Sequence, residues 1–409
     1  MLGSDKFGHI KLAPDDAILQ TAIAFRNDSH TDKVNLGVGA YRTDEGKPLL
    51  FRAVKEAEKQ ILADPATNKE YLGIDGHLKF NKLAQELLLG ESSSAVLEKR
   101  VASVQTISGT GSLRIGAEFL SMFFNPSCVL ISRPTWGNHI TIFERARIPV
   151  KYYPYWNPKT KGVDIEGMIN ALNDAPEKSI VLLHACAHNP TGVDPTPDQW
   201  ERIADVMARK DLLPYFDSAY QGFATGSIER DAFAIRMFIS RGFQCVISQS
   251  FAKNMGLYGE RIGALHIVCR TSEIADKVLS QLKIVIRPMY SNPPMHGALI
   301  AAKVLEDPAL KNIWLSELEQ VSQRIIQMRR VLLEELVRIE TPGDWTHITS
   351  QIGMFSFTGL SPAQCENMIK KWHCYMLTNG RISMAGINSR NYQHVARAIK
   401  DSLQIREKL

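Results

Sequence analysis

The sequence predicts an α/β fold with a mostly parallel sheet covered by helices. Short apolar runs alternate with helical patterns along most of the chain, which is typical of such sheets. One much longer helical pattern separates this region from a C-terminal tail of mixed short elements. With 409 residues, of which 44% are hydrophobic, the chain is long enough for two domains around a large core.

Six apolar runs are candidate strands, because each is short and is bounded by turn-forming residues. The first run is followed by the segment Ser108–Ser112, predicted to be a loop, and then by a helical pattern from Leu113 to Phe123. The six runs are Val101–Ile107, Cys128–Ser132, Ile180–His184, Pro214–Asp217, Cys245–Ser250 and Gly263–Val268.

The longest helical pattern runs from Pro308 to Thr341 and has apolar residues at spacings of three, four and seven. A helix of this length can bridge two domains. Thr341-Pro342-Gly343 then ends it, because proline and glycine break helices. The tail from Trp345 to Leu409 mixes short strand patterns with helical ones, which predicts a second, smaller α+β unit.

Composition excludes several classes of function. The net charge is +5 and both signs are interspersed, so no basic block indicates nucleic acid, although small anionic ligands suit the chain. No apolar run has the length of a membrane span. The six cysteines show no Cys-x-x-Cys spacing and are typical of reduced core residues in an intracellular protein. The first fourteen residues show neither a secretory signal nor a basic transit peptide.

A lysine stands close to a hydroxyl at the end of one predicted strand. Ser250 and Lys253 follow the apolar run that begins at Cys245, and Arg261 comes shortly after them. Both side chains therefore emerge at the carboxyl end of a strand, where α/β sheets bind ligands. A lysine without such a context is usually a solvated surface charge. Here the context favours a Schiff-base lysine held over a phosphorylated cofactor.

The segment Ser108–Ser112, with the sequence Ser-Gly-Thr-Gly-Ser, lies between a predicted strand and a predicted helix. Backbone N–H groups at a helix N-terminus bind anions such as phosphate. Such a segment more often serves only as a turn and a helix cap, without binding a ligand. The segment also lacks the third glycine and the acidic residue of the dinucleotide fingerprint, so phosphate is the better ligand hypothesis.

Three further strand ends carry polar or aromatic side chains. Asp217 ends an apolar run among aromatics, and a carboxylate there is costly without a partner; capping the next helix is the alternative role. Asn189 is fixed in the turn Asn189-Pro190-Thr191-Gly192 as a rigid hydrogen-bond donor. The preceding His-Ala-Cys-Ala-His segment can also suggest a metal, but three ligands without a fourth motif make this the weaker hypothesis. Trp136 follows another run, where it is either core or a surface for stacking a planar ring.

Together these motifs resemble the pyridoxal-phosphate aminotransferases of the aspartate aminotransferase type, which are class I enzymes of fold type I. The motifs occur in the order and at roughly the separations of that family, from Leu12 to the last helix. The resemblance implies a large cofactor domain with a seven-stranded, mostly parallel sheet and helices on both faces, plus a smaller α+β domain. It also implies an N-terminal arm at 1–15, a small domain at 16–48 and 321–409, and a large domain at 49–320.

The resemblance implies catalytic roles for four side chains. Lys253 resembles the Schiff-base lysine, Asp217 the partner of the pyridine nitrogen, and Trp136 the aromatic that stacks on the ring. Asn189 and Tyr220 resemble the donors to the phenolate oxygen of the ring. The four catalytic candidates are therefore Lys253, Asp217, Tyr220 and Trp136.

The resemblance also implies the phosphate ligands and their neighbours. Tyr71 resembles the tyrosine that reaches the phosphate of the neighbouring subunit, and His139 the histidine that supports the aspartate. Ala252 and Gly73 depart from a serine and a proline that some relatives carry, which affects only fine tuning. The expected phosphate ligands within the subunit are Ser108, Gly109, Thr110, Ser250 and Arg261.

Two arginines imply a dicarboxylic substrate. Arg381 matches the clamp of the family for the substrate α-carboxylate, a task that suits a planar, bidentate donor. Arg287 matches the arginine that crosses from the partner subunit to the side-chain carboxylate. Gly39 would contact the substrate through its backbone, alongside Trp136 and Asn189. A homodimer with shared active sites follows, with no metal, nucleic acid or membrane partner.

The implied reaction is reversible transfer of the amino group from L-aspartate to 2-oxoglutarate by a ping-pong mechanism. Lys253 would move the Cα proton, since burial near cations lowers the pKa of a lysine. The alternative within this chemistry is an aromatic or kynurenine transaminase. A nicotinamide dehydrogenase would need the absent fingerprint, and a non-catalytic binding protein would have little use for Lys253. A cytoplasmic location is expected, with mitochondrial or peroxisomal location as the alternatives.

Overall fold

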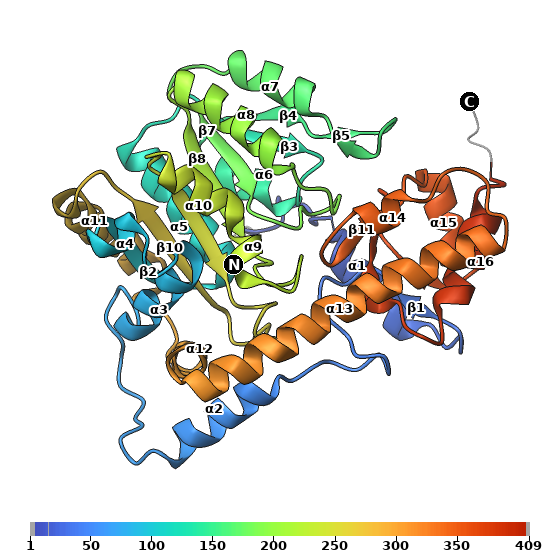
Figure 1. Cartoon of the computed structure of the whole chain (residues 1–409), viewed down its shortest axis with the longest axis horizontal. Helices are drawn as coiled ribbons and strands as arrows, with labels where there is room; N and C mark the ends of the chain where they lie inside the picture. The colour runs from blue at the N-terminus through green and yellow to red at the C-terminus, as the bar shows by residue number, and fades with distance from the viewer. Residues whose placement is uncertain (1–4, 15, 406–409) are drawn as a thin grey trace.

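The computed structural model describes residues 5–14 and 16–405. The expected N-terminal arm at 1–15 therefore lies partly outside the described residues, and the chain end considered as a peroxisomal address, Arg406–Leu409, lies wholly outside them. Figure 1 shows two parts of unequal size, with one long helix, α13 (Pro308–Arg338), running between them.

The larger part is built on a seven-stranded sheet. Strand β10 is antiparallel to both of its neighbours, β2 and β9, and the remaining neighbours pair in parallel. This confirms the predicted α/β class and the mostly parallel sheet. Across the sheet the order is β2 (Val101–Ile107), β10 (Ile262–Val268), β9 (Val246–Ser250), β8 (Leu213–Ser218), β7 (Ile180–His184), β3 (Val129–Arg133) and β4 (Val150–Pro154).

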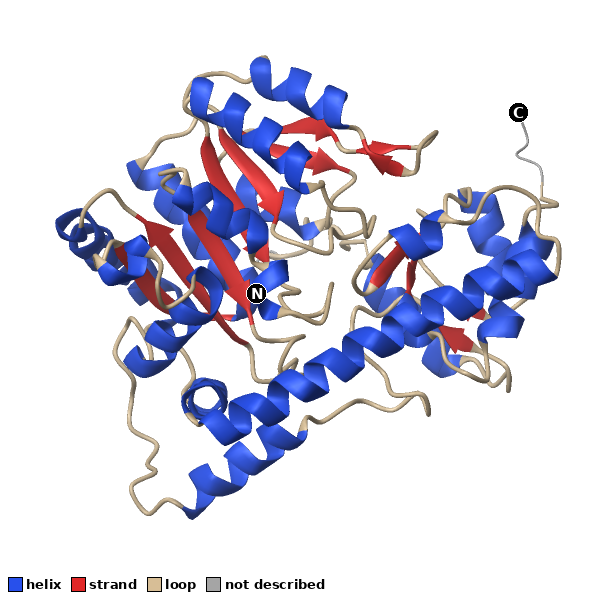
Figure 2. Cartoon of the chain, viewed as in Figure 1, coloured by secondary structure: helices blue, strands red, loops and turns tan. Residues whose placement is uncertain are grey.

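Helices cover both faces of this sheet (Figure 2). Along β7, Ile180 and Leu182 join the apolar core on one face, whereas Val181 and Leu183 join the core on the other. This is the two-sided burial expected of a parallel strand. One face carries α5 (Ser108–Phe123), α6 (Asn138–Arg145) and α11 (Ser272–Tyr290). The other carries α3 (Leu78–Leu89), α4 (Ser94–Leu97), α7 (Ile165–Asn173), α8 (Pro197–Arg209) and α10 (Phe233–Ser240).

The predicted long helix is confirmed as α13. Asp307 caps it, because its side chain accepts hydrogen bonds from the backbone N–H groups of Ala309 and Leu310, and Pro308 occupies the first turn. The helix packs on α2 (Arg52–Ala63) and α12 (His296–Glu306) at its N-terminal end. The remaining elements of the larger part are β5 (Trp156–Asn157), β6 (Gly162–Val163) and α9 (Ile228–Asp231).

The smaller part combines the two ends of the described chain. Strand β1 (Val34–Asn35) pairs in parallel with β12 (Cys374–Tyr375), and β11 (Phe355–Phe357) pairs antiparallel with β13 (Arg381–Ser383). These short strands, with the helices around them, confirm the smaller α+β unit that the tail predicts. Its other elements are α1 (Ala17–Asn27), α14 (His347–Ser350), α15 (Pro362–Lys370), the 3₁₀ turn η1 (Met384–Gly386) and α16 (Tyr392–Ser402).

Two details of the sequence interpretation are wrong. Residues 108–112 are not a loop, because α5 begins at Ser108 directly after β2. Strand β4 has no counterpart among the six apolar runs, since Lys151, Tyr152 and Pro154 are exposed at the edge of the sheet. An edge strand lacks the continuous apolar pattern of a buried strand.

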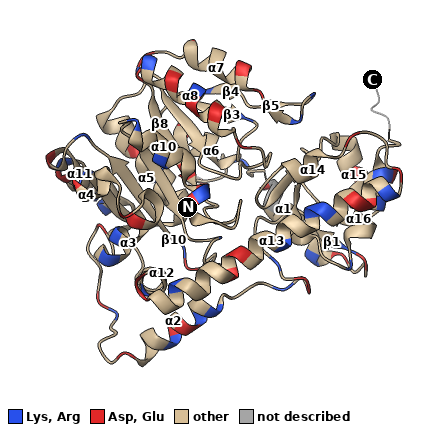
Figure 3. Cartoon of the chain, viewed as in Figure 1, with Lys and Arg blue, Asp and Glu red and all other residues tan. Residues whose placement is uncertain are grey.

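Charged residues of both signs lie on both parts of the molecule. In Figure 3 the positions of acidic and basic residues are interspersed over the helices of both parts. Among the described residues, no helix combines the length and the apolar character needed to cross a membrane.

Candidate active site

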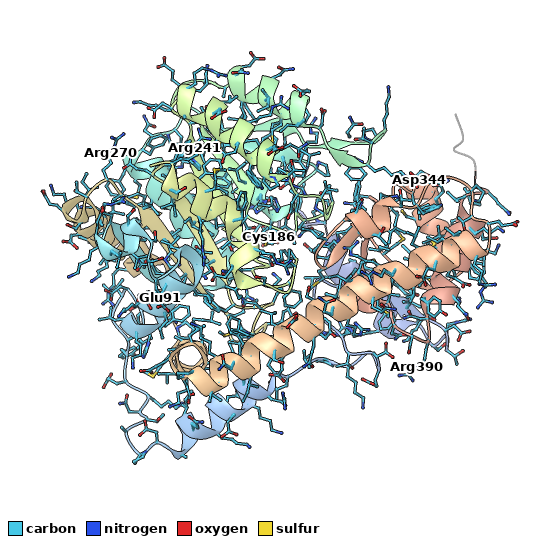
Figure 4. All side chains as sticks on the ribbon, in the orientation of Figure 1. Glu91, Cys186, Arg241, Arg270, Asp344 and Arg390 are labelled. Atoms are coloured by element: carbon cyan, nitrogen blue, oxygen red, sulfur yellow. The ribbon has the colours of Figure 1, made fainter. Side chains whose placement is uncertain are left out.

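A cavity of about 200 Å³ opens at the carboxyl edge of the sheet, where residues from β7, β8 and β9 meet residues of the smaller part. It brings together the predicted site residues except Tyr71, Arg287 and the supporting His139. Figure 4 labels one lining residue, Cys186, between the two parts of the molecule. The predicted residues that line the cavity are Gly39, Ser108, Gly109, Thr110, Trp136, Asn189, Asp217, Tyr220, Ser250, Lys253, Arg261 and Arg381.

One end of the cavity is suited to an anion. Helix α5 begins there, where the N–H of Ser108 donates to the carbonyl of Arg261 and the next residues, Gly109 and Thr110, line the cavity end with the first turn of the helix. The hydroxyls of Ser108 and Ser250 lie 3.3 Å apart, and the exposed Arg261 adds a positive charge. Helix dipole, hydroxyls and guanidinium together form the kind of site that binds phosphate.

Close packing fixes the start of α5 against the sheet. A Cβ atom at Gly263 on β10 would lie 2.6 Å from the carbonyl oxygen of Gln249 and 2.7 Å from the carbonyl carbon of Ser108. Both are backbone atoms, so neither can move aside. Only glycine therefore allows β10 to lie between β9 and the first residues of the helix.

Asp217 lines the cavity near the end of β8. Its side chain is 11% exposed, and its Oδ2 atom lies 3.1 Å from Nε2 of His139. Burial opposes ionisation, but the hydrogen bond from His139 and the nearby His184 and Lys253 outweigh it and hold the pKa of Asp217 below its usual value. The cavity therefore contains a fixed negative charge at neutral pH.

A chain of hydrogen bonds sets the tautomer of His139. The backbone N–H of Asn189 donates to Nδ1 of His184, which leaves the proton of that ring on Nε2. This nitrogen lies 3.4 Å from Oγ1 of Thr135, which in turn lies 2.9 Å from Nδ1 of His139. The hydroxyl donates to His139, so His139 carries its proton on Nε2 and donates it to Asp217.

The histidines are therefore organised around a carboxylate. Burial, reinforced by the nearby His139 and opposed by Asp217, lowers the pKa of His184 to about 3, which keeps His184 neutral. No group of three or more His, Cys, Asp and Glu side chains in the described ranges is arranged to hold a metal ion.

Lys253 lies half-buried just past β9, with its ammonium group 5.1 Å from the ring centroid of Tyr220. Burial lowers its pKa, Asp217 acts in the opposite direction, and Arg261 lowers it further. A lysine with a lowered pKa releases its proton more readily and can act as a base or a nucleophile.

Arg381, on β13 of the smaller part, lines the cavity and is 3% exposed. Its Nη2 donates to the carbonyl of Gly37 at 2.7 Å and its Nη1 to Oδ1 of Asn189 at 3.2 Å, while its Nε has no hydrogen-bond partner among the described residues. Since Oδ1 of Asn189 accepts this bond, the NH₂ group of Asn189 is left to donate elsewhere. Burial lowers the pKa of Arg381 to about 10. A buried cation with an unused donor is suited to a carboxylate ligand.

Tyr71 and Arg287 lie away from the cavity of their own chain. Tyr71 is 85% exposed. Arg287, near the end of α11, is also exposed and donates to Oγ of Ser291 at 2.6 Å. Neither side chain contributes to the cavity within a single subunit.

Sequence reasoning missed several lining residues. His184 and Cys186 belong to the segment that precedes Asn189, so strand-end position is a signal that could have found them. Leu113 and Ala219 adjoin predicted residues but carry no chemical signal of their own. Phe355 comes from β11 in the smaller part, and nothing in the local sequence links it to the cavity.

Comparison with known proteins shows the family of the chain. The family model for aminotransferase class I and II matches residues 31–399. The chain belongs to this family. This aminotransferase is therefore a transaminase, an enzyme that exchanges an amino group between amino acids and 2-oxo acids.

Known relatives cover almost all of this aminotransferase. It is 53% identical to the cytoplasmic aspartate aminotransferase of Oryza sativa subsp. japonica over 98% of each chain. The solved aspartate aminotransferase from Saccharomyces cerevisiae cytoplasm superposes with a TM-score of 0.95 at 44% identity, again over 98% of each chain. An aromatic-amino-acid aminotransferase from Burkholderia pseudomallei, covalently bound to pyridoxal phosphate, matches with a TM-score of 0.95 at 44% identity, over 98% of this chain and 100% of that one.

Proposed function

We propose that this aminotransferase transfers the amino group of L-aspartate to 2-oxoglutarate, giving oxaloacetate and L-glutamate, with pyridoxal 5'-phosphate as cofactor. The observation that carries the proposal is the content of one cavity: a lysine with a lowered pKa, an ionised aspartate, a helix start suited to an anion, and a buried arginine that has no acidic partner in the described part of the chain. The names of the relatives support the choice of aspartate.

The residues present fit pyridoxal phosphate. The start of α5, with Ser108, Ser250 and Arg261, would hold the phosphate, and Gly109 and Thr110 supply backbone N–H groups there. Asp217 would meet the ring nitrogen, since Oδ2 is bonded to His139 and Oδ1 accepts no hydrogen bond from the described residues. Further contacts to the ring would come from the half-buried Trp136, which stacks on it, and from Asn189 and Tyr220, which donate to its phenolate oxygen.

The side chains then divide the chemistry between them. When bound, pyridoxal phosphate carries the amino group and takes up the electron pair left at the substrate Cα. Asp217 keeps a proton on the ring nitrogen, which strengthens that electron uptake. Lys253 Nζ would take the proton from the substrate Cα and release it to the cofactor, as its lowered pKa allows. Arg381 and the backbone of Gly39 hold the substrate so that Cα faces Lys253.

The site would be completed by a second subunit. Tyr71 and Arg287 are exposed and lie outside the cavity of their own chain. In the proposed homodimer Tyr71 reaches the phosphate of the partner subunit, and Arg287 binds the side-chain carboxylate of the substrate there. Two arginines at the two ends of the substrate would select a dicarboxylic acid.

Absorbance and product analysis of the purified chain test this proposal. With pyridoxal phosphate we expect a band near the edge of the visible range, which aspartate shifts and 2-oxoglutarate restores, with formation of oxaloacetate and glutamate. The alternative function is a transaminase for aromatic amino acids, and the observation that supports it is the presence of Trp136, Tyr220 and Phe355 in the cavity lining. Turnover of phenylalanine without turnover of aspartate would therefore contradict the assignment.

We expect Arg287→Ala to change specificity more than catalysis. The substrate side-chain carboxylate loses a charged partner worth roughly 2–5 kcal/mol when one member is removed, or about a thirtyfold to several-thousandfold fall in kcat/KM for aspartate. Turnover of phenylalanine, which never uses this contact, should hold or rise. The control Arg381→Ala should depress both substrates, because both carry the α-carboxylate. An equal loss for aspartate and phenylalanine in Arg287→Ala would mean that Arg287 is structural.

We expect activity on aspartate to rise when two variants that each have little activity on aspartate are mixed. An Arg287 variant and a Lys253 variant each lack one component, but a hybrid dimer contains one site with both components intact. After unfolding and refolding together, the mixture should recover up to about a quarter of wild-type activity on aspartate, since half of the dimers are hybrids with one intact site of two. Full activity in a verified monomer would contradict shared sites.

The division of the chain also remains a proposal. We propose a small domain of residues 16–48 and 321–409 and a large domain of residues 49–320, supported by the separation of the short sheets from the seven-stranded sheet. The cytoplasmic location stays a prediction, because relatives named for the chloroplast, cytoplasm and mitochondrion all match.

A further inference from the structure

We propose that Arg329 is a positioning residue for the substrate, acting through Phe355 on the guanidinium of Arg381. The inference rests on the proposed function, in which Arg381 binds the α-carboxylate. Arg329 lies on α13, outside the cavity, and touches neither the substrate nor the cofactor in that scheme.

Arg329 is a buried cation whose partners are backbone carbonyls. Its side chain is 2% exposed, Nη1 donates to the carbonyl of Ile348, and Nη2 donates to the carbonyls of Gly353 and Phe355; the first two bonds are each 2.8 Å long. Burying a charge in this way is costly without a partner of opposite sign. Its partners all lie in one segment, 348–355, so the charge fixes the path of that segment.

The segment held by Arg329 ends at Phe355, the first residue of β11. The ring of Phe355 is 2% exposed and lines the cavity, with its centroid 4.2 Å from the guanidinium carbon of Arg381. It also meets the ring of Tyr220 edge to face at 6.0 Å. Arg381 therefore lies on an aromatic face, which favours one plane for its guanidinium.

The same segment packs against the turn that carries Asn189. The N–H of Ile352 donates to the carbonyl of Gly192 at 2.7 Å, and a Cβ atom at Gly192 would lie 2.5 Å from the carbonyl oxygen of Phe355. Asn189, three residues earlier, accepts a hydrogen bond from Arg381. Movement of segment 348–355 would thus disturb both the ring beneath Arg381 and the amide beside it.

The test compares Arg329→Met with Arg329→Lys and with Leu332→Ala. Methionine keeps much of the volume but removes all three hydrogen bonds, whereas Leu332→Ala removes a buried apolar side chain from the same helix and leaves those bonds intact. We expect Arg329→Met to raise KM for aspartate and phenylalanine alike by about tenfold to a hundredfold, the effect of small misplacement in a site. The value of kcat and the Kd for pyridoxal phosphate should change little, and lysine should restore part of the lost affinity.

Calorimetry adds a measurement that does not depend on turnover. The Kd of 2-oxoglutarate should rise in Arg329→Met by the same factor as KM and should stay near the wild-type value in Leu332→Ala. An equal change in both variants would show general destabilisation and would overturn the inference. Should Arg329→Met fail to fold, Phe355→Leu tests the same path, and an unchanged Kd for 2-oxoglutarate in that variant would also overturn the inference.

A double-mutant cycle with Arg381→Ala separates this inference from the proposed function. If Arg329 acts through Arg381, its substitution should add little once Arg381 is absent. If Arg329→Met raises KM by its full factor in the Arg381→Ala background as well, the role of Arg329 is overturned. The role of Arg381 in binding the α-carboxylate is then unaffected. An Arg381→Ala variant with unchanged KM would instead remove the clamp itself, and the inference with it.

Discussion

Lys253→Ala should retain pyridoxal phosphate but lose transamination by at least about 10⁴-fold, the upper range for removal of a general base. The phosphate end of the cavity and Asp217 are untouched by this change, so the cofactor keeps most of its contacts. The proton on the substrate Cα then has no acceptor with a lowered pKa. Single-turnover absorbance with aspartate measures the loss directly.

An added primary amine provides the control for Lys253→Ala. A small amine that enters the cavity supplies the missing base and should restore part of the rate in proportion to its concentration. Lys253→Arg should stay inactive, because a guanidinium keeps its proton at neutral pH. Substantial turnover in Lys253→Ala without any added amine would remove Lys253 from the proposed role.

Asp217→Asn should lower the rate of amino-group transfer by about 10²–10³-fold, the range for loss of one preorganised electrostatic contact. Asparagine keeps the shape and can still accept the hydrogen bond from His139, but the negative charge in the cavity is lost. A fall in rate in this variant therefore reports the loss of the negative charge and not a change in the shape of the side chain. Rapid-mixing kinetics of each half reaction, with aspartate and with 2-oxoglutarate, measure the effect.

Asp217→Glu is the matched control, because it keeps the charge and moves it by one methylene group. It should lose less activity than Asp217→Asn if charge dominates. A normal rate in Asp217→Asn would mean that the carboxylate only closes the hydrogen-bond chain from His184 through Thr135 and His139.

The buried parts of the fold were predictable from local patterns. Strands β7 and β9 are apolar runs because both of their faces are covered, and α13 has a capping aspartate, a proline in its first turn and a long periodic pattern. Strand β4 was not predictable in this way, because its edge position leaves Lys151 and Tyr152 exposed. The boundary at Ser108 was misjudged because serine and glycine favour loops, while contact with β9 and β10 holds them in a helix.

The residues of the site can also be divided into those that local sequence patterns predict and those that they do not. Asp217 lies at the carboxyl end of its strand and Lys253 and Asn189 lie just past theirs, so their convergence at one edge of the sheet follows from parallel topology. Phe355 and Arg329 were not predictable, since their link to Arg381 depends on how α13 and β11 pack in three dimensions. Tyr71 and Arg287 belong to a third group, whose proposed target lies on another chain.

The pairing of β1 with β12 has a consequence for how the protein is made. Val34 pairs with Cys374, and Asp28 just before β1 bonds to His373 and Tyr375, so the first and last parts of the chain meet. All seven strands of the large sheet lie between residues 101 and 268 and can assemble while the ribosome is still working. The segment around β1 must wait exposed until residue 375 has emerged. During that interval the exposed segment is a suitable binding site for chaperones. The wall of the cavity that carries Arg381 has also not yet formed.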